Sequence, residues 1–159
     1  MQTANTKDTI EIIEFTDELS EPIKTLNYEW LERYFRVEES DIMSLSDPKK
    51  YIIDKGGFIY YASLHGNIVG TVSLIKKTDN IYELGKMAVT HSAQGYGIGK
   101  RLIEHCLTIA KQKRISKLVL YSNTQLKSAM HLYKTYGFKE VPLEDTLYER
   151  ADIKMEKHL

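Results

Sequence analysis

The chain has 159 residues, a length typical of one domain and sufficient to bury a complete hydrophobic core. It carries 22 basic and 22 acidic side chains, so its formal net charge is +0, and 42% of its residues are hydrophobic. This neutral, ordinary composition argues against a protein that binds nucleic acid or an anionic membrane surface through an excess of positive charge.

Targeting signals, membrane segments and disulfides set further limits. The first residues are polar and do not show the basic-then-apolar pattern of a signal peptide. No apolar run approaches the roughly 20 residues that a membrane helix needs. The single cysteine, Cys106, rules out an intramolecular disulfide and fits a reducing compartment. We therefore expect one cytoplasmic domain over residues 1–159, with residues 1–9 flexible, and no nucleic-acid or membrane partner.

The N-terminal half predicts one strand, two helices and three more strands. Residues 10–15 form an apolar strand, and the pattern then changes to that of a helix over residues 20–35, with a Ser cap and a Pro in its first turn. Residues 47–57 predict a short helix that begins at an Asp cap and ends at two glycines. The breaks HGN and KTDN divide residues 58–89 into three antiparallel strands.

The C-terminal half alternates helices and strands. One helix runs from a glycine-rich loop to about residue 114 and buries Cys106. Residues 117–122 then form a strand that should pair in parallel with the strand before this helix. A helix over residues 123–138 ends at a glycine, and two strands follow around residues 138–141 and 148–155. The order β-α-α-β-β-β-α-β-α-β-β predicts an α/β (α+β) fold, with a mixed, mostly antiparallel sheet of about seven strands and helices on both faces.

Three glycines, Gly95, Gly97 and Gly99, precede the first of these helices, which opens at Gly97 or Gly99. Backbone N–H groups at a helix N-terminus bind anions, and glycine lets the backbone approach a phosphate closely. The spacing fits neither the Walker A nor the Rossmann pattern. The loop therefore favours another phosphate or pyrophosphate ligand, with a purely structural connection as the alternative. Since no His and Cys residues show metal-ligand spacing, no metal is expected.

Two blocks of the sequence resemble the GNAT superfamily of N-acetyltransferases. The stretch Gln94-Gly95-Tyr96-Gly97-Ile98-Gly99 fits that family's [QR]-x-x-G-x-[GA] signature at the start of a helix after a strand. The second block runs from Asn123 through the following helix to Tyr136-Gly137-Phe138. The resemblance covers nearly the whole chain from Ile10. It implies acetyl-coenzyme A as the acetyl donor, no metal, and the homodimer that is common in the family.

The resemblance also implies which residues hold the coenzyme. Backbone N–H groups of the loop bind the pyrophosphate, and they belong to Gln94, Gly95, Tyr96, Gly97, Ile98, Gly99 and Lys100. The pantetheine arm pairs with the strand before the loop, through the backbone of Met87, Ala88 and Val89. Asn123 reaches this arm or the backbone beside it, and Tyr136 packs in the fold or lies beside the coenzyme.

Acetyl transfer to an amine requires a base for the amine, a stabilised thioester oxygen and a stabilised thiolate. Glu83 is the candidate base because residues 83, 85, 87 and 89 are expected to share one strand face; a solvated edge glutamate is the alternative. Tyr133 matches the family's acid and is the candidate proton donor to the thiolate, with a packed core aromatic as the alternative. The backbone N–H of Val89 is the expected oxyanion donor.

The first two helices and the last strand pair are expected to wall the acceptor pocket. Tyr34 or Phe35, at the end of the first helix, is the candidate acceptor contact from that side, whereas Trp30 has the spacing of a core residue. The acidic residues Glu38, Glu39 and Asp41 follow directly. They would attract a cationic amine, but a solvated loop is the default expectation for them.

Tyr148 and Arg150 are the candidate acceptor contacts in the last strand. Arg150 either binds an acceptor carboxylate bidentately or pairs with Asp152 on the same strand face. The sequence thus predicts an acetyl-coenzyme A-dependent N-acetyltransferase that acts on the primary amine of a small molecule, such as an amino acid, by direct transfer in a ternary complex. The alternatives are a non-catalytic acyl-coenzyme A sensor or scaffold, and acetylation of a protein N-terminus or lysine.

Overall fold

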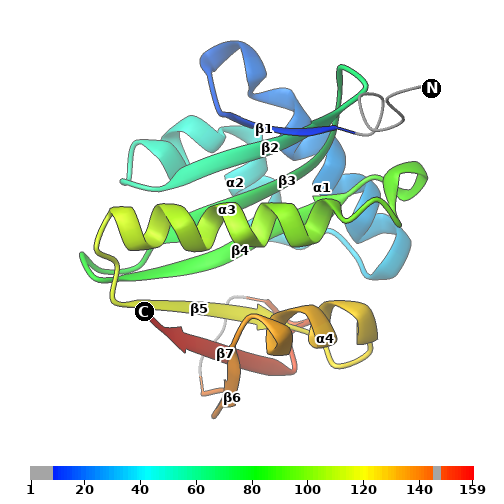
Figure 1. Ribbon diagram of the computed structural model, residues 1–159. Helices are drawn as coiled ribbons and strands as arrows, with labels where there is room; N and C mark the ends of the chain where they lie inside the picture. The colour runs from blue at the N-terminus through cyan, green and yellow to red at the C-terminus, as the bar shows by residue number, and fades with distance from the viewer. Residues whose placement is uncertain (1–8, 145–147) are drawn as a thin grey trace, which may run out of the picture.

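The computed structural model describes residues 9–144 and 148–159, so the expectation of a flexible N-terminus falls, apart from Thr9, outside the described residues. Its centre is a seven-stranded sheet with the order β1-β2-β3-β4-β5-β7-β6 (Figure 1). The strands are β1 (Ile10–Glu14), β2 (Phe58–Leu64), β3 (Asn67–Lys76), β4 (Ile81–Val89), β5 (Lys117–Ser122), β6 (Lys139–Val141) and β7 (Ile153–His158). All neighbours are antiparallel except β4 and β5, which are parallel. The expected mixed, mostly antiparallel sheet is confirmed.

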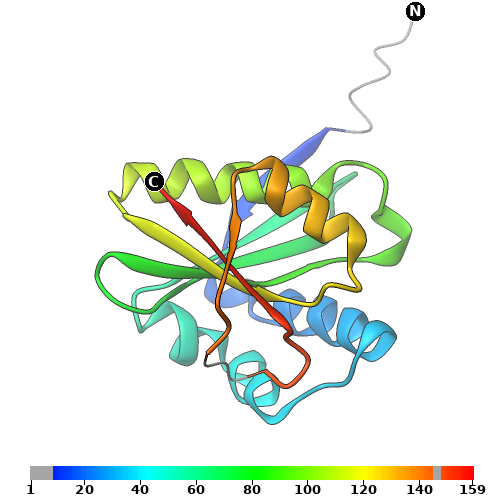
Figure 2. The same cartoon turned by 90° about the horizontal axis from the view of Figure 1, so that it is seen from below.

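Helices cover both faces of this sheet, as expected. They are α1 (Glu21–Tyr34), α2 (Glu39–Ser46), α3 (Ile98–Gln112) and α4 (Lys127–Thr135), with short helical turns at Asp17–Leu19, Lys49–Ile53 and His91–Ala93. Figure 2 shows α3 and α4 together on one face and α1 and α2 on the other. Within the described ranges, no helix combines the length and the apolar character that a membrane crossing requires.

The sheet separates two apolar cores because successive strand residues point to opposite faces. In β2, Tyr60 and Leu64 belong to the core under α3 and α4, whereas Ile59 and Tyr61 belong to the core under α1 and α2. Cys106 of α3 is completely buried in the first core, as expected, and burial raises the pKa of its thiol. The central strands are therefore packed on both sides and give rigid support to the loops at their ends.

The segment between α1 and β2 differs from the prediction. Residues 38–41, expected as a solvated loop, instead start α2, and both Glu38 and Asp41 are buried. The Glu38 backbone N–H donates a hydrogen bond to Asp41 Oδ2 at 2.9 Å and closes a capping box. The sequence did not indicate this start because Glu is not among the usual N-cap residues. The helix expected over residues 47–57 is limited to Lys49–Ile53.

The last strand begins later than predicted. β7 starts at Ile153, whereas the alternating pattern predicted a strand from residue 148. Asn123 Nδ2 donates a hydrogen bond to the backbone oxygen of Arg150 at 2.7 Å, and the Arg150 side chain reaches α2. Tyr148, Arg150 and Ala151 therefore lie before β7, where they line a pocket.

Candidate active site

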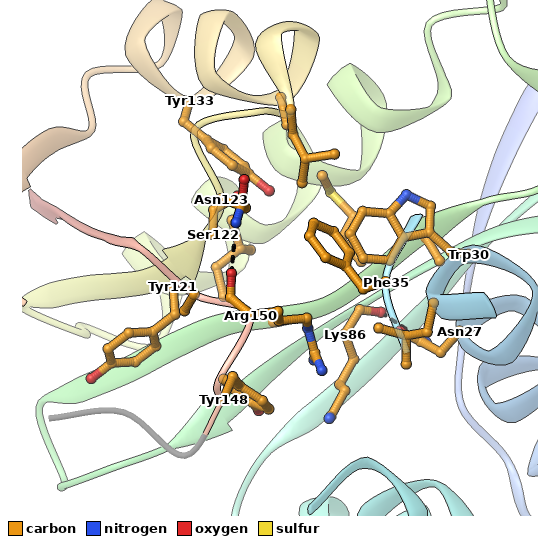
Figure 3. Close-up of a pocket in the computed structure, with 18 of the residues that line it drawn as sticks. Asn27, Trp30, Phe35, Lys86, Tyr121, Ser122, Asn123, Tyr133, Tyr148 and Arg150 are labelled. Carbon is orange, nitrogen blue, oxygen red and sulfur yellow. Dashed lines mark hydrogen bonds between the residues drawn. The ribbon is translucent and has the colours of Figure 1, made fainter. Parts of the chain in front are cut away.

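A pocket opens where β4 and β5 diverge. The two strands pair only over residues 81–83 and 117–119, although β4 continues to Val89 and β5 to Ser122. Beyond Glu83, the edge of β4 that faces β5 has no partner strand in the described part of the chain. A pocket of about 280 Å³ lies at this opening, lined by α1, β4, β5, α4 and residues 148–151 (Figure 3). The unpaired edge offers backbone hydrogen-bonding groups to an extended ligand.

A bulge in β4 decides which side chains reach this pocket. The register between β3 and β4 shifts, so that one residue of β3 lies opposite two residues of β4, one of which is Lys86. Lys86 has a left-handed backbone with φ 53°. Because the extra residue reverses the alternation, Leu84 and Met87 pack on the same core, and Glu83 faces the opposite side. The expectation that residues 83, 85, 87 and 89 share one face is therefore wrong.

Glu83, the predicted base, lines the pocket and is buried, with 4% of its surface exposed. Its Oε1 lies 3.2 Å from Nζ of Lys77, which follows β3. The alternative of a solvated edge glutamate is therefore wrong. A buried carboxylate beside a pocket is positioned to accept a proton from a bound amine, directly or through one water molecule.

Tyr133, the predicted acid, lines the same pocket from α4. Its ring is 9% exposed and makes an edge contact with Phe138, at 6.1 Å between centroids. Burial raises the pKa of Tyr133 to about 12, so its hydroxyl is protonated at neutral pH. Figure 3 shows this side chain beside Asn123, across the pocket from Trp30 and Phe35. Tyr133 is thus both a packed aromatic and a pocket residue.

The glycine loop forms a second, more open groove that adjoins the pocket, and we call it the glycine-loop groove. Its floor comes from the loop and its far wall from the start of α4, and Gln94, Leu126 and Ala129 line both cavities. Gly95 and Gly97 have positive φ angles of 94° and 77°, and a Cβ on either would meet nothing within 4 Å. The loop therefore presents bare backbone, at the N-terminus of α3, to open space. Such an end is suited to a phosphate or pyrophosphate.

The predicted coenzyme residues are brought together except for two tyrosines, Tyr96 and Tyr136, which line neither cavity. The following line the pocket, the glycine-loop groove or both: Met87, Ala88, Val89, Gln94, Gly95, Gly97, Ile98, Gly99, Lys100 and Asn123. Tyr96 lies within the loop and is exposed. Tyr136 lines neither cavity, because its hydroxyl donates a hydrogen bond to Glu104 Oε2 at 2.6 Å between α4 and α3. This bond to a carboxylate raises the pKa of Tyr136 to about 12.

A carboxylate from α1 anchors the beginning of the loop. Glu29 accepts hydrogen bonds from Thr90 Oγ1 at 2.8 Å and from the backbone N–H of His91 at 2.9 Å. Trp30, the next residue of α1, lines both the pocket and the glycine-loop groove, so its assignment to the core is wrong. Of the two predicted acceptor contacts on this helix, Phe35 lines the pocket and Tyr34 lines only the groove.

A buried ionic network closes one end of the pocket. Both terminal nitrogens of Arg150 donate to Asp41, at 2.7 and 3.0 Å, and Nη1 also donates to Glu38 at 3.1 Å. Lys86 Nζ donates at 2.8 Å to Asp41 Oδ1, the oxygen that also accepts from Arg150 Nη2. The Tyr148 ring lies 4.6 Å from the Arg150 guanidinium and 5.0 Å from Lys86 Nζ. We call these five residues the charged end of the pocket.

The charged end corrects one prediction and adds two residues. Asp152 accepts hydrogen bonds from Thr124, so the expected Arg150–Asp152 pair is wrong. Burial opposes ionisation of Asp41, but hydrogen bonds from Arg150 and the charge of Lys86 outweigh it and lower the pKa of Asp41 to about 2. Burial lowers the pKa of Lys86, and Asp41 opposes this shift. Asp41 and Lys86 were not candidates from the sequence, although Asp41 belongs to the acidic run that was noted there.

The described side chains offer no arrangement of three or more His, Cys, Asp or Glu residues that would hold a metal ion. The pocket itself presents a buried carboxylate, a buried phenol, a pair of cations and exposed backbone groups.

Comparison with known sequences identifies the family of this chain. Residues 25–138 match the Acetyltransferase (GNAT) family. Over 113 residues the chain is 35% identical to N-acetylaspartate synthetase of Xenopus tropicalis, and over 111 residues it is 33% identical to N-acetyltransferase 8B of Homo sapiens. These matches cover 70% and 66% of the chain, but only 40% and 46% of the two relatives. The chain thus spans less than half the length of either relative.

Comparison with solved structures gives the same fold. A GNAT-family acetyltransferase from Staphylococcus aureus Mu50 superposes with a TM-score of 0.83 at 23% identity, covering 94% of this chain and 99% of that one. The PaiA N-acetyltransferase from Thermoplasma acidophilum in complex with coenzyme A superposes with a TM-score of 0.71 at 22% identity, covering 95% and 99%. The family match extends over most of the chain and agrees with the fold, so the chain belongs to the acetyltransferase (GNAT) family.

Proposed function

We propose that the protein is an N-acetyltransferase that transfers the acetyl group of acetyl-coenzyme A to the primary amine of a small molecule, within a ternary complex. One observation carries this proposal: the glycine-loop groove and the pocket adjoin where β4 and β5 separate. A donor whose pyrophosphate lies in the groove and whose pantetheine arm follows β4 would reach an acceptor in the pocket. Family membership and the relatives' names support the same activity.

The chain's own groups fit acetyl-coenzyme A. The loop backbone from Gln94 to Lys100, at the N-terminus of α3, would bind the pyrophosphate, and the unpaired edge of β4 around Met87, Ala88 and Val89 would pair with the pantetheine arm. Asn123 supports this opening by holding the backbone of Arg150. When bound, acetyl-coenzyme A supplies an acetyl group activated as a thioester.

Glu83 and Tyr133 are the proposed catalytic residues. The amine must lose a proton to become a nucleophile, and the buried Glu83 carboxylate accepts that proton, directly or through one water molecule. The Tyr133 hydroxyl, protonated because its pKa is raised, donates its hydrogen toward the sulfur side of the opening. The backbone N–H of Val89 is the proposed oxyanion donor. No metal is needed for these roles.

The size and lining of the pocket favour a small acceptor. A cavity of about 280 Å³ enclosed by Trp30, Phe35 and Tyr133 suits a compact amine better than a polypeptide segment. Amino acids are the first class to test. One relative is named N-acetylaspartate synthetase, which acts, as its name says, to form an acetylated amino acid. Acetylation of a protein N-terminus or lysine is the competing acceptor class.

Thiol release from acetyl-coenzyme A in the presence of an amine panel tests the activity. The Glu83→Gln and Tyr133→Phe variants are expected to lower kcat by about 100-fold or more while the affinity for coenzyme A, measured by calorimetry, stays unchanged. The exposed Glu140 and the half-buried Tyr51, both outside the pocket, provide the matched controls Glu140→Gln and Tyr51→Phe. Tight coenzyme A binding without turnover of any amine would instead identify a sensor or scaffold.

A further inference from the structure

The charged end of the pocket presents two cations to any acceptor. Lys86 and Arg150 both line the pocket, and Figure 3 shows their side chains directed to the same end, beside Tyr148. The two cations come from elements far apart in the sequence and share one counter-ion, Asp41. The number of carboxylates paired with each cation differs, and this difference indicates which of them is available to a ligand.

The charge of Arg150 is compensated by two carboxylates. Its two terminal nitrogens make three charge-assisted hydrogen bonds, two with Asp41 and one with Glu38. Lys86 Nζ, by contrast, donates only to Asp41 among the described residues. Since an ammonium group has three donors, two of them have no acceptor within the described part of the chain. Arg150 also keeps two of its five donors, but it pairs with two carboxylates, whereas Lys86 shares its one counter-ion with Arg150. Lys86 is thus the less compensated of the two cations.

The burial and backbone conformation of Lys86 both cost free energy of folding, which a functional role for this residue would explain. Its side chain is 4% exposed, and burial of an ammonium group opposes its charged form. Its backbone also has φ 53°, a conformation that glycine or asparagine adopts more readily than lysine. The ion pair with Asp41 offsets part of this cost. An incoming anion that completes the hydrogen bonds of Lys86 would offset more.

The charges around Lys86 indicate which second group an anionic ligand should carry. Lys86 and Arg150 are balanced by the buried carboxylates of Asp41 and Glu38, which do not line the pocket. Glu83, which does line it, lies close enough to interact electrostatically with Lys86 and Tyr148. The pocket surface therefore offers a carboxylate for an ammonium and, nearby, an ammonium for a carboxylate. A zwitterion with adjacent amino and carboxylate groups matches both.

We infer that Lys86 binds the carboxylate of the acceptor, with Arg150 and Asp41 as positioning residues that hold Lys86 in place, and that the acceptor is an amino acid whose amino group lies beside Glu83. This inference names the acceptor class and rests on the proposed acetyltransferase activity. It also reassigns the carboxylate contact from Arg150 to Lys86, because the Arg150 guanidinium is held by Asp41 and Glu38.

The test compares each amino acid with its amide and with its decarboxylated amine, which keep the amino group and remove the charge. The measurement is kcat/KM from thiol release, together with acceptor affinity by calorimetry in the presence of coenzyme A. The wild-type protein is expected to prefer the amino acid by about 10- to 100-fold, as for a hydrogen bond to a charged group. In Lys86→Met this preference should fall to about threefold or less. The reason is that kcat/KM should fall for the amino acid and stay unchanged for its amide and its decarboxylated amine.

The exposed Lys111 on α3 gives the matched control Lys111→Met, which should retain the full preference. Equal losses for the amino acid and its amide in Lys86→Met would show a structural role only and overturn the inference. If that variant does not fold, the wild-type comparison still decides, since equal rates for amino acids and amides overturn it. Turnover of amines without any carboxylate dependence would leave the acetyltransferase proposal intact, whereas turnover of no amine would remove both.

Discussion

The glycine-loop groove and the charged end of the pocket lie on one sheet but are built by different interactions. The glycine loop, which forms the floor of the groove, consists of consecutive residues before α3, and it offers backbone N–H groups made accessible by Gly95 and Gly97. The charged end consists of side chains from α2, the β4 bulge and residues 148–150, joined by ion pairs across 45 and 109 positions of sequence. One is a local structure, and the other exists only in the folded chain.

Because of this difference, the two regions should respond differently to substitution. A local backbone site keeps its shape as long as its own turn and helix form, and it does not depend on the rest of the molecule for charge. A buried ionic network has the opposite property. Each of its charges was removed from water at a cost, so that loss of one member leaves its partners uncompensated. Substitutions should therefore affect coenzyme binding and stability separately, depending on the region.

The largest effect is expected from Asp41→Asn, which removes the counter-ion of both Lys86 and Arg150. We expect a loss of about 3 kcal/mol in the free energy of unfolding, measured by urea denaturation, because two buried cations lose their partner. Coenzyme A affinity, measured at a temperature where the variant is folded, should stay within about twofold. The control is Asp54→Asn, since Asp54 pairs with Lys49 at 3.0 Å at the surface and should contribute less than about 1 kcal/mol.

An intermediate effect on stability is expected at low pH. The pKa of Asp41 is lowered from 3.8 to about 2, so its contribution is complete above the unfolded pKa and is lost as pH falls from about 4 toward 2. The shift corresponds to about 2 kcal/mol. The stability difference between the wild-type protein and Asp41→Asn should therefore shrink by about this amount over that range. A difference that stays constant down to pH 3 or below would contradict the role of the two cations.

The smallest effect on stability, but a specific one, is expected from Gly97→Ala. Gly97 has φ 77° and Gly66, in the hairpin between β2 and β3, has φ 79°; a Cβ at either meets nothing within 4 Å. Both Gly97→Ala and Gly66→Ala should cost about 1 kcal/mol of stability through the same left-handed backbone. Only Gly97→Ala should weaken coenzyme A binding, by about tenfold or more. Equal coenzyme A affinities in the two variants would contradict the role of the loop.

The order of elements and the glycine loop could be predicted from the sequence alone. Hydrophobic periodicity depends on residues within one strand or helix, so it can be recognised without the fold. A turn that needs positive φ angles is likewise marked in the sequence by its glycines. For that reason the mixed sheet, the buried Cys106 and the start of α3 at the glycine loop all agree with the structure. Gln94 through Gly99 could be assigned to one loop because they are neighbours in the chain.

The residues on the acceptor side of the pocket could be assigned only from the folded chain. The β4 bulge turns Glu83 and Met87 to opposite faces, and no residue pattern within β4 marks it, because the bulge is defined by register against β3. The burial of Asp41 and the partners of Arg150 depend on segments that meet across 109 positions. Ion pairs of this kind have no periodicity, since any acidic and any basic residue can form them. The fold therefore had to be known before Lys86 could be placed in the pocket.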